Sequence, residues 1–400
     1  MNKKLNLLAA AALSCVGVAQ AQNSITFYGA LDAGVLNMSS TAAGYAATST
    51  SATAATADTG KFTGIKDGGI GGSNLGLKGE RDMGNGNKGY FQLQANISLT
   101  DGKIGGWNAG ATQGYGNFNQ MALVGLSGKA GDLKVGRQVS PMYFAMVSTD
   151  ARAGRYFGST LTTLVGMNTA TKAWSGAGNA IYGNVYNDNS VTYTAPKFGN
   201  TTVSLQHIFG GTNGSNTAKS QDAVTAVYNK DGLRLSALYY SGNGNGNSAE
   251  ATTAAGFTPT ANTNRLTSLG ALYTTGAWTM SFATFDGKIP SGAQVAATAA
   301  AVAGSTHTTA SALGLAYKLD PEITISGGLY NIKDKTNDGN KATQTAVSVD
   351  YTMFKDTIVY LQTANTKNTG SNMNLSPIFG SAAPAGKSNN ATMIGLRYTF

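Results

Sequence analysis

Alternation of apolar and polar side chains is the dominant pattern along this chain. At the C-terminus, Thr392, Ile394, Leu396, Tyr398 and Phe400 occupy every second position, and the residues between them form the other set. A period of two places the two sets on opposite faces of an extended strand. The same pattern recurs in residues 25–35, 91–99, 233–239 and 323–329, and helical spacing fits none of these segments. The pattern therefore predicts an all-β protein.

The connections between these strands are of two kinds that alternate along the chain. Seven are short and carry turn residues, at 82–88, 127–132, 196–200, 229–232, 275–276, 320–321 and 354–356. Eight are long and rich in Ala, Thr, Ser, Asn and Gly, at about 39–60, 102–117, 139–187, 210–219, 242–263, 287–307, 332–342 and 367–389. Fifteen connections join sixteen strands. We therefore expect a 16-stranded antiparallel transmembrane β-barrel with short periplasmic turns and long extracellular loops.

Tyrosines support this assignment because they recur near the ends of strands that run toward the short turns. The six residues are Tyr193, Tyr228, Tyr273, Tyr317, Tyr351 and Tyr398. An interfacial aromatic girdle predicts such a recurrence, whereas the general preference of tyrosine for strands does not favour one end.

The N-terminal segment is a separate unit. Residues 1–21 combine a basic start at Lys3 and Lys4, an apolar stretch and an Ala19-Gln20-Ala21 cleavage site, which predicts a signal peptide. A lipoprotein cleavage site at Cys15 is the alternative. The barrel domain is then 22–400. Because Cys15 is the single cysteine of the chain, that domain contains no thiol for a disulfide, a metal site or a nucleophile.

Composition and charge exclude several classes of function. Beyond the leader, no stretch approaches the roughly 20 apolar residues of a transmembrane helix. The net charge is +9, but the basic residues are scattered, so we expect no nucleic-acid partner. With two histidines, His207 and His307, and no catalytic constellation, we expect no enzyme, no metal site and no cofactor. The glycine run at 68–72 does not join a strand to a helix as a phosphate loop would, and we interpret it as chance.

Two groups of residues are candidates for a pore. Asn74, Lys78 and Glu80 fall on the polar parity of their strand, although any water-filled lumen needs polar residues without individual roles. The connection Val139 to Asn187 carries Asp150, Arg152, Arg155 and Lys172 among aromatic residues. Its length and composition suggest that it folds inward and narrows the pore, with a solvated loop as the alternative.

The chain resembles a known family, the general trimeric porins of Gram-negative bacteria of the Neisseria and Burkholderia type. The resemblance rests on the order and spacing of several segments. These are Ile25–Gly34, Ser73–Glu80 with Asp82-Met83-Gly84, Val124–Gly128, Val135-Gly136-Arg137-Gln138, Asn189–Pro196 and the terminal Arg397-Tyr398-Thr399-Phe400. It covers essentially the whole chain after the leader.

The resemblance implies a homotrimeric outer-membrane channel for passive diffusion of ions and small hydrophilic solutes. It also implies that the third loop folds into the lumen opposite a basic wall, and that the barrel-assembly machinery reads Tyr398 and Phe400. The surroundings would be outer-membrane lipid and lipopolysaccharide. Where the family often has arginine, this chain has Asn74, Gln120 and Tyr186. We therefore expect a pore constriction formed by eight residues, Arg137, Asp150, Arg152, Arg155, Lys78, Glu80, Asn74 and Gln120. We also expect a weak to moderate anion preference.

Strict alternation raises one conflict with this implication. Counting from Leu133 and Val135, Arg137 would point toward lipid, which is a costly position for a charge. We therefore expect a bulge near Arg137 or the end of the apolar band there. Two other hypotheses remain: a plugged barrel that acts as an adhesin or enzyme, and a secreted soluble β-protein.

Overall fold

The computed structural model describes residues 24–42, 58–105, 118–170, 185–211, 220–243, 263–288, 307–370, 373–381 and 383–400. The expected signal peptide, 1–21, lies outside these residues. The strands are β1 (Ser24–Ala42), β2 (Asp58–Asp67), β3 (Asn74–Gly84), β4 (Asn87–Asn96), β5 (Met121–Gly128), β6 (Gly131–Val139), β7 (Tyr186–Thr194), β8 (Thr201–Ile208), β9 (Gln221–Lys230), β10 (Leu233–Asn243), β11 (Thr263–Thr275), β12 (Trp278–Lys288), β13 (His307–Lys318), β14 (Ile323–Asp334), β15 (Lys341–Phe354), β16 (Thr357–Thr369) and β17 (Ser388–Thr399). Two helices, α2 (Pro141–Val147) and α3 (Thr160–Ala170), lie between β6 and β7.

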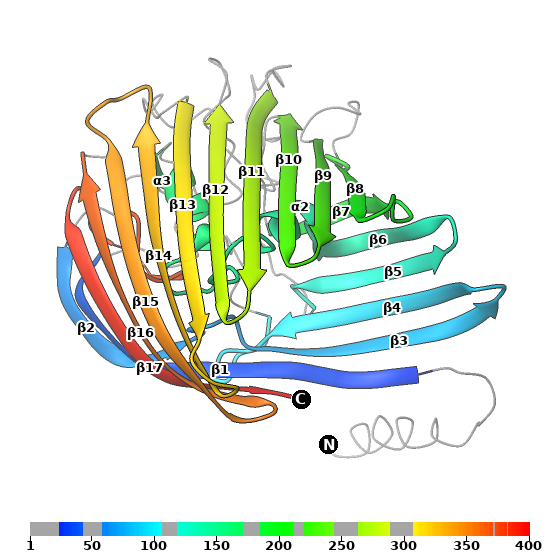
Figure 1. Ribbon diagram of the computed structural model, residues 1–400, viewed down its shortest axis with the longest axis horizontal. Helices are drawn as coiled ribbons and strands as arrows, with labels where there is room; N and C mark the ends of the chain where they lie inside the picture. The colour runs from blue at the N-terminus through cyan, green and yellow to red at the C-terminus, as the bar shows by residue number, and fades with distance from the viewer. Residues whose placement is uncertain are drawn as a thin grey trace, which may run out of the picture.

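The strands form one antiparallel sheet that closes on itself. Apart from β2 and β3, each strand pairs with its neighbours in sequence, and β17 returns to pair with β1 from Ala30↔Thr399 to Met38↔Ala391. The segments β2 and β3 occupy one position of the wall, because β1 pairs with β3 over Ser24–Ala30 and with β2 over Ala33–Ala42. The seventeen segments of the described chain therefore make sixteen barrel strands, which confirms the expected fold (Figure 1).

The two faces of the wall differ as the alternation predicts. Large apolar side chains point outward; for example, Leu313 is 51% and Leu361 50% exposed. Their neighbours along the strands, Ala312 and Gln362, are buried inside. A lipid-facing exterior and a polar interior are the pattern of a membrane barrel. No helix in the described ranges is long and apolar enough to cross a membrane.

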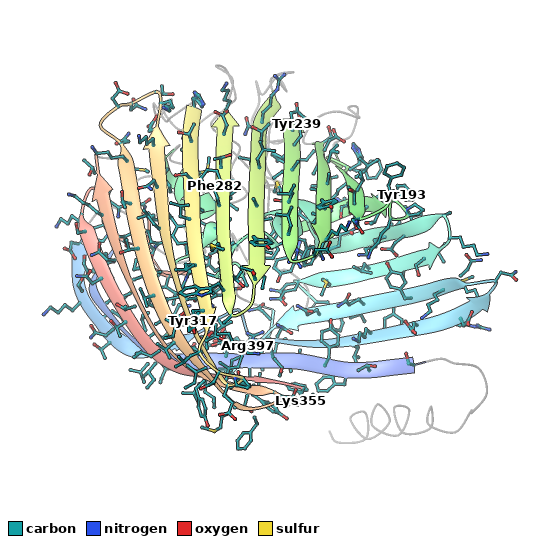
Figure 2. The ribbon with its side chains drawn as sticks, viewed as in Figure 1. Tyr193, Tyr239, Phe282, Tyr317, Lys355 and Arg397 are labelled. Atoms are coloured by element: carbon teal, nitrogen blue, oxygen red, sulfur yellow. The ribbon has the colours of Figure 1, made fainter. Side chains whose placement is uncertain are left out.

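The aromatic girdle is also present. All six tyrosines lie on outward parity at the short-turn end, and Tyr398 is 46% exposed. Tyr317 lies near that end of β13 (Figure 2), where its ring contacts Trp278 at 4.4 Å between centroids. Because these rings have an apolar body and a polar tip, they mark the boundary between lipid and water.

Two details of the connections differ from expectation. The predicted loop at 332–342 is shorter, because β14 continues to Asp334 and β15 begins at Lys341. The glycine run at 68–72 is not a chance feature, since it interrupts the second barrel strand between β2 and β3. In the shorter loop the Asp334 carboxylate accepts from Thr336 N and Asn337 N at 2.8 and 2.9 Å, a local turn that alternation does not reveal.

Candidate functional site

The connection between β6 and β7 folds into the lumen, as the sequence suggested. Its first helix, α2, is capped by Ser140, whose Oγ accepts from Met142 N at 3.2 Å, and Pro141 occupies the first turn. Met142 and Met146 of α2 pack in one apolar cluster with Leu238 and Tyr240, which are on the inner face of β10. The helix therefore lies against the inner wall of the barrel (Figure 1).

The second helix, α3, extends this apolar contact. Leu164 and Met167 are buried against Tyr330 and Ile332 of β14, together with Leu375 from the connection before β17. A water-filled lumen was expected to need polar residues, but on this side it contains an apolar cluster. Burial of these side chains stabilises the inward fold by roughly 1.5–3 kcal/mol for each large apolar residue.

Arg152 fixes the middle of the loop to the wall. Its side chain is 1% exposed. Nε donates to Gly158 O at 2.7 Å and Nη2 to Phe157 O at 2.8 Å, both within the loop. Nη1 donates to Ser326 O at 3.1 Å, Ser326 Oγ at 3.0 Å and Ser348 Oγ at 3.0 Å, on β14 and β15. Arg152 is thus a buried anchor rather than an exposed charge of the pore.

Arg155 and Asp150 are likewise bound by other groups of the protein. The two terminal guanidinium nitrogens of Arg155 donate to Asp350 on β15, Nη1 at 2.8 Å. Asp150 is 5% exposed and accepts from the backbone N–H groups of Arg152, Gly154 and Thr160 at 2.8, 3.2 and 2.9 Å. The last of these contacts gives a hydrogen-bond partner to a backbone N–H group at the start of α3, where the helix itself provides none. The geometry therefore favours a positioning role for both residues.

Arg137 lies at the irregularity that the sequence required. The register of β6 against β7 shifts between Gly136 and Gln138, which confirms the expected bulge. The Arg137 side chain is 13% exposed, and Nη1 is 2.5 Å from Asp188 Oδ1. Its Nε donates to Asn119 O at 2.6 Å. Because Asp188 offsets its charge, Arg137 contributes less field to the lumen than a free arginine would.

A second inward segment was missed by the sequence analysis. The carboxylate of Asp32, which is fully buried, accepts from the backbone N–H groups of Gly69, Ile70 and Gly71 at 3.1, 3.0 and 2.9 Å. Tyr360 OH donates to it at 2.7 Å and Arg397 Nη1 at 3.2 Å. Three successive N–H groups around one anion form a nest. Segment 68–73 is therefore folded around Asp32.

This nest also holds the third loop. Tyr156 N donates to Ile70 O at 3.2 Å, and Phe379 N donates to Tyr156 O at 2.6 Å. Burial raises the pKa of the Tyr156 hydroxyl well above its ordinary value, so the ring is a neutral group here. The third loop is thus bound between segment 68–73 and the connection before β17. Two features of the sequence could have revealed this inward segment: an acidic residue in the middle of a strand and a glycine run within a strand.

The other candidates lie on the opposite wall. Asn74, Lys78 and Glu80 share the inner face of β3, as predicted. Asn74 Nδ2 donates to Gly72 O at 3.2 Å, Lys78 Nζ lies 5.4 Å from the centre of the Tyr28 ring, and Glu80 pairs with Lys88 at 3.0 Å. Gln120 accepts from Gln94 Nε2 at 2.5 Å. This wall is polar, whereas the opposite wall carries the packed loop.

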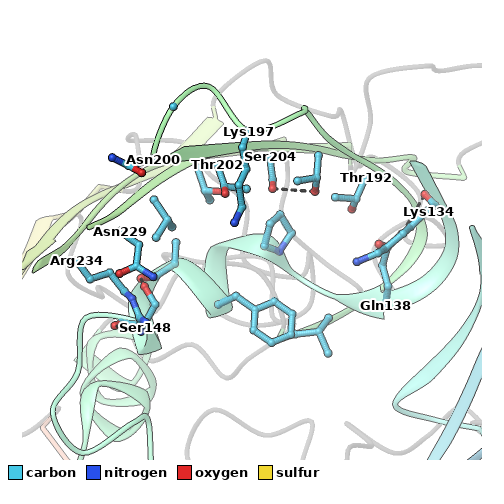
Figure 3. A pocket seen from close by; sticks show the side chains of 18 residues that line it. Lys134, Gln138, Ser148, Thr192, Lys197, Asn200, Thr202, Ser204, Asn229 and Arg234 are labelled. Atoms are coloured by element: carbon cyan, nitrogen blue, oxygen red, sulfur yellow. Dashed lines mark hydrogen bonds between the residues drawn. The ribbon is translucent and has the colours of Figure 1, made fainter. Parts of the chain in front are cut away.

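A cavity of about 420 Å³ lies between α2 and the inner faces of β6 to β10. Three cationic side chains line it: Lys134, Lys197 and Arg234 (Figure 3). Its back wall carries the hydroxyls of Thr192, Thr194, Thr202 and Ser204, and none of the described residues that line it has a carboxylate. Arg234 Nη1 donates to Ser148 O at 3.1 Å, and Lys134 Nζ is 3.4 Å from Asp132. The cavity is therefore positively charged and wettable.

The two predicted assembly residues lie together at the barrel seam. The Phe400 backbone exchanges hydrogen bonds of 3.0 and 3.1 Å with Gly29 of β1. Its ring lies 5.5 Å from that of Phe27 and 5.9 Å from that of Tyr398, between centroids. A Cβ atom at Gly29 would come within 2.7 Å of the Phe400 ring, so glycine is required for this contact.

Comparison with known proteins supports this architecture. The profile of the family described as Gram-negative porin matches residues 7–371. This chain belongs to the Gram-negative porin family. The family and the barrel place it in the outer membrane. The chain is 27% identical to outer membrane porin protein 32 of Delftia acidovorans over 206 residues, which is 52% of this chain and 50% of that protein. It is 36% identical to major outer membrane protein P.IB of Neisseria meningitidis serogroup B over 137 residues, 34% of each chain.

These curated matches span half or less of the length of the two relatives. Solved structures extend the likeness of the fold to nearly the whole chain. An anion-selective porin from Comamonas acidovorans superposes with a TM-score of 0.73 at 20% identity, covering 95% of this chain and all of that one. OmpT of Vibrio cholerae superposes with a TM-score of 0.63 at 13% identity, covering 96% and 99%. At such identities the likeness concerns the fold.

Proposed function

We propose that this protein is a water-filled channel for passive diffusion of ions and small hydrophilic solutes across the outer membrane, rather than an enzyme. The observation that carries the proposal is the asymmetry of the lumen. The third loop covers the inner wall from β9 to β15 with buried apolar contacts. The wall of β3 to β8 presents polar side chains, and the cationic cavity lies next to it between α2 and the inner faces of β6 to β10. Solutes would therefore pass along the β3–β8 side.

We further propose a weak anion preference whose main source is the cavity. Arg137 is paired with Asp188 and Arg155 with Asp350, so their net contribution to the field is small. Lys197 and Arg234 form no ion pair within the described residues. In a narrow lumen the effective dielectric constant falls below that of water, so such charges act strongly on passing ions. An anion-selective relative with the same fold is consistent with this proposal.

The test is the zero-current potential of single channels across a salt gradient. We expect Lys197→Gln with Arg234→Gln to lower the anion-to-cation permeability ratio by about twofold at low salt, and less at high salt because screening shortens the reach of each charge. Arg137→Gln should change the ratio less, and Lys355→Gln, at a short turn outside the lumen, is the control. A larger effect of Arg137 than of the cavity pair would place the selectivity at Arg137 instead.

The proposed channel would assemble as a homotrimer, in line with the structural relative described as a trimer form. Apolar side chains on the outer faces of β1, β3 and β17, such as Phe27, Leu77 and Ile394, are exposed in the single chain and could pack against another protomer. The barrel-assembly machinery, which the resemblance implies reads Phe400, would act before trimers form.

A further inference from the structure

One aromatic side chain of the third loop faces the cationic cavity instead of the barrel wall. Met142, Ala145 and Met146 of α2 are buried, whereas Phe144 on the same helix is 56% exposed. Its ring contacts that of Tyr143 edge to face, at 5.9 Å between centroids, and lines the cavity. An exposed aromatic ring gives up the free energy of apolar burial. A ligand that covered Phe144 would recover this free energy.

The ring belongs to an apolar patch on one side of the cavity. The other members of the patch are Val139, at the end of β6, and Pro141 and Ala145 of α2. The hydroxyl groups of the back wall come from β7 and β8. The cavity therefore has two unlike sides, an apolar side at the loop and a polar side at the barrel wall.

Two cations of the cavity have no counter-charge within the described residues. Lys197 lies in the turn between β7 and β8 and extends into the cavity (Figure 3). Arg234 of β10 lies at one end of the cavity (Figure 3), and in the described part of the chain its side chain makes one hydrogen bond, from Nη1 to Ser148 O at 3.1 Å. A guanidinium group has five N–H donors in a planar fork that fits a carboxylate. Most donors of Arg234 are therefore left for a ligand.

These features together select one class of ligand. An inorganic anion would neutralise the cations but leave Phe144 uncovered. A neutral apolar solute would cover Phe144 but leave Lys197 and Arg234 without a counter-charge. A flat molecule with a carboxylate at one end satisfies both sides, because guanidinium groups bind carboxylates in a bidentate mode and aromatic rings pair edge to face or offset. The volume of about 420 Å³ lies within the range of about 300–1,000 Å³ for small-molecule pockets.

We propose that this cavity binds arylcarboxylates, of which benzoate is the simplest, with the carboxylate on Lys197 and Arg234 and the ring on Phe144. The proposal rests on the proposed channel function and names a substrate class for it. Lys197 and Arg234 both lie at the short-turn ends of their strands, so the site is at that end of the lumen. Conduction requires binding that is weak enough for release, and one carboxylate with one ring meets this condition.

The test is equilibrium dialysis of the full folded chain in detergent against ring-labelled benzoate, with detergent alone as the blank. Succinate supplies the charge without the ring, and benzyl alcohol supplies the ring without the charge. Phe144→Ala removes the ring of the site, and Phe144→Tyr keeps it. The matched control is Phe198→Ala, because Phe198 is 86% exposed in the same turn as Lys197 and is not among the described residues that line the cavity.

We expect Phe144→Ala to bind benzoate about threefold to tenfold more weakly than the wild type, which is the range that an aromatic pair contributes. Phe144→Tyr and Phe198→Ala should bind benzoate like the wild type. Succinate and benzyl alcohol should each bind more weakly than benzoate. Equal binding of benzoate by the wild type and Phe144→Ala would overturn the proposal. Equal affinities of the wild type for succinate and benzoate would also overturn it, since they would indicate a general anion site.

A second variant tests the cationic side and leaves Phe144 in place. Lys197→Gln combined with Arg234→Gln should weaken benzoate binding by at least about tenfold, because charge-assisted hydrogen bonds to the carboxylate are lost. The binding of benzyl alcohol should stay the same. An unchanged affinity of this double variant for benzoate would place the ligand elsewhere and overturn the proposal.

Channel measurements separate this proposal from the proposed function. In planar bilayers the wild type should conduct potassium chloride, and added benzoate should reduce the unitary current. Phe144→Ala should raise the half-maximal benzoate concentration by the same factor as in dialysis. If the wild type formed no channel, the proposed function would fail while dialysis still measured the site. A wild type that conducted potassium chloride but retained no benzoate in dialysis would overturn this inference alone.

Discussion

At the scale of single residues, the structure separates charges that hold the fold from charges that act on solutes. Asp32 is the clearest example of the first kind, because five donors surround its buried carboxylate. Buried ionised groups are tolerated when they are paired and fully hydrogen-bonded, and removal of one partner costs about 3–5 kcal/mol. Arg152 follows the same logic in the third loop. Lys197 and Arg234 are of the second kind.

Gly69 tests the role of the Asp32 nest. A Cβ atom there would lie 2.3 Å from Tyr360 Oη, so Gly69→Ala must displace either the segment or the tyrosine that donates to Asp32. We expect the temperature at which the folded barrel loses its compact electrophoretic mobility to fall by several degrees, as a loss of 1–3 kcal/mol typically gives. Gly339→Ala is the control, because nothing lies within 4 Å of that Cβ. Equal midpoints for both variants would contradict a structural role for the nest.

At the scale of elements, the third loop is positioned by contacts with many strands. α2 packs on β9 and β10, Ala151 N donates to Ser281 Oγ of β12 at 2.9 Å, and Thr162 Oγ1 donates to Gln344 of β15 at 2.7 Å. Helix α3 is not amphipathic by its sequence, because protein surrounds it. The loop is therefore fixed by tertiary packing and not by its own helical propensity.

A cross-link can test the inward fold of the loop. Thr149 Oγ1 and Ser236 Oγ of β10 are buried and 3.0 Å apart. We expect Thr149→Cys with Ser236→Cys to form a disulfide on mild oxidation, detected as a mobility shift that reductant reverses. Conductance should remain as in the wild type, because the bond joins groups already in contact. Each single variant is a control. A double variant that stayed fully reduced would argue against the inward position of Thr149.

The final strand carries the second prediction at this scale. Phe400 completes the β17–β1 pairing through Gly29 and stacks near Tyr398. Deletion of Phe400 should reduce the amount of protein in the outer membrane, while surviving channels keep the wild-type unitary conductance. Phe354→Ala is a matched control, since this exposed aromatic residue lies at a short turn away from the seam. Normal levels of the deletion variant in the outer membrane would show that assembly does not depend on Phe400.

At the scale of the whole molecule, the barrel has two unlike halves. The interior between β9 and β17 is filled by the third loop, segment 68–73 and residues 373–379, which bury two apolar clusters. The interior along β3 to β8 is polar, and the cationic cavity lies at its border, between α2 and β6 to β10. Outside, apolar residues are exposed on β1, β3 and β17, which meet at the seam. Such a surface fits either lipid or another protomer.

We expect a heat-sensitive trimer. Apolar contact between outer faces near the seam would hold three barrels together in mild detergent. Unheated electrophoresis should show a slow band, and boiling should convert it to a band just below the 40.9 kDa of the full chain. Phe27→Asp combined with Ile394→Asp, on the outer faces of β1 and β17, should weaken the slow band, and Leu313→Asp on β13 is the control. A monomer under all mild conditions would contradict the trimer.

Part of the fold and of the site could be predicted because the signal is local. Alternation gave the strands and their outward faces, and the tyrosines gave the short-turn interface. The parity of Arg137 required a bulge or the end of the apolar band, and the register shift between Gly136 and Gln138 shows the bulge. The partners of Arg137, Arg152 and Arg155 could not be predicted, because Asp188, Ser326 and Asp350 reach them only after distant strands are aligned. The glycine run was misread for the same reason, since its partner Asp32 lies on another strand.

The sequence by itself determined the closed barrel. Period-two patterning and alternating connection lengths act over a few residues each, and closure satisfies every backbone group without further information. The tertiary structure alone decided which charges remain free. Asp32, Asp150 and Asp350 are bound by backbone and arginine donors inside the lumen, while Lys197 and Arg234 form no ion pair within the described residues. Electrostatic energy depends on distance and burial, and neither is encoded by position along the chain.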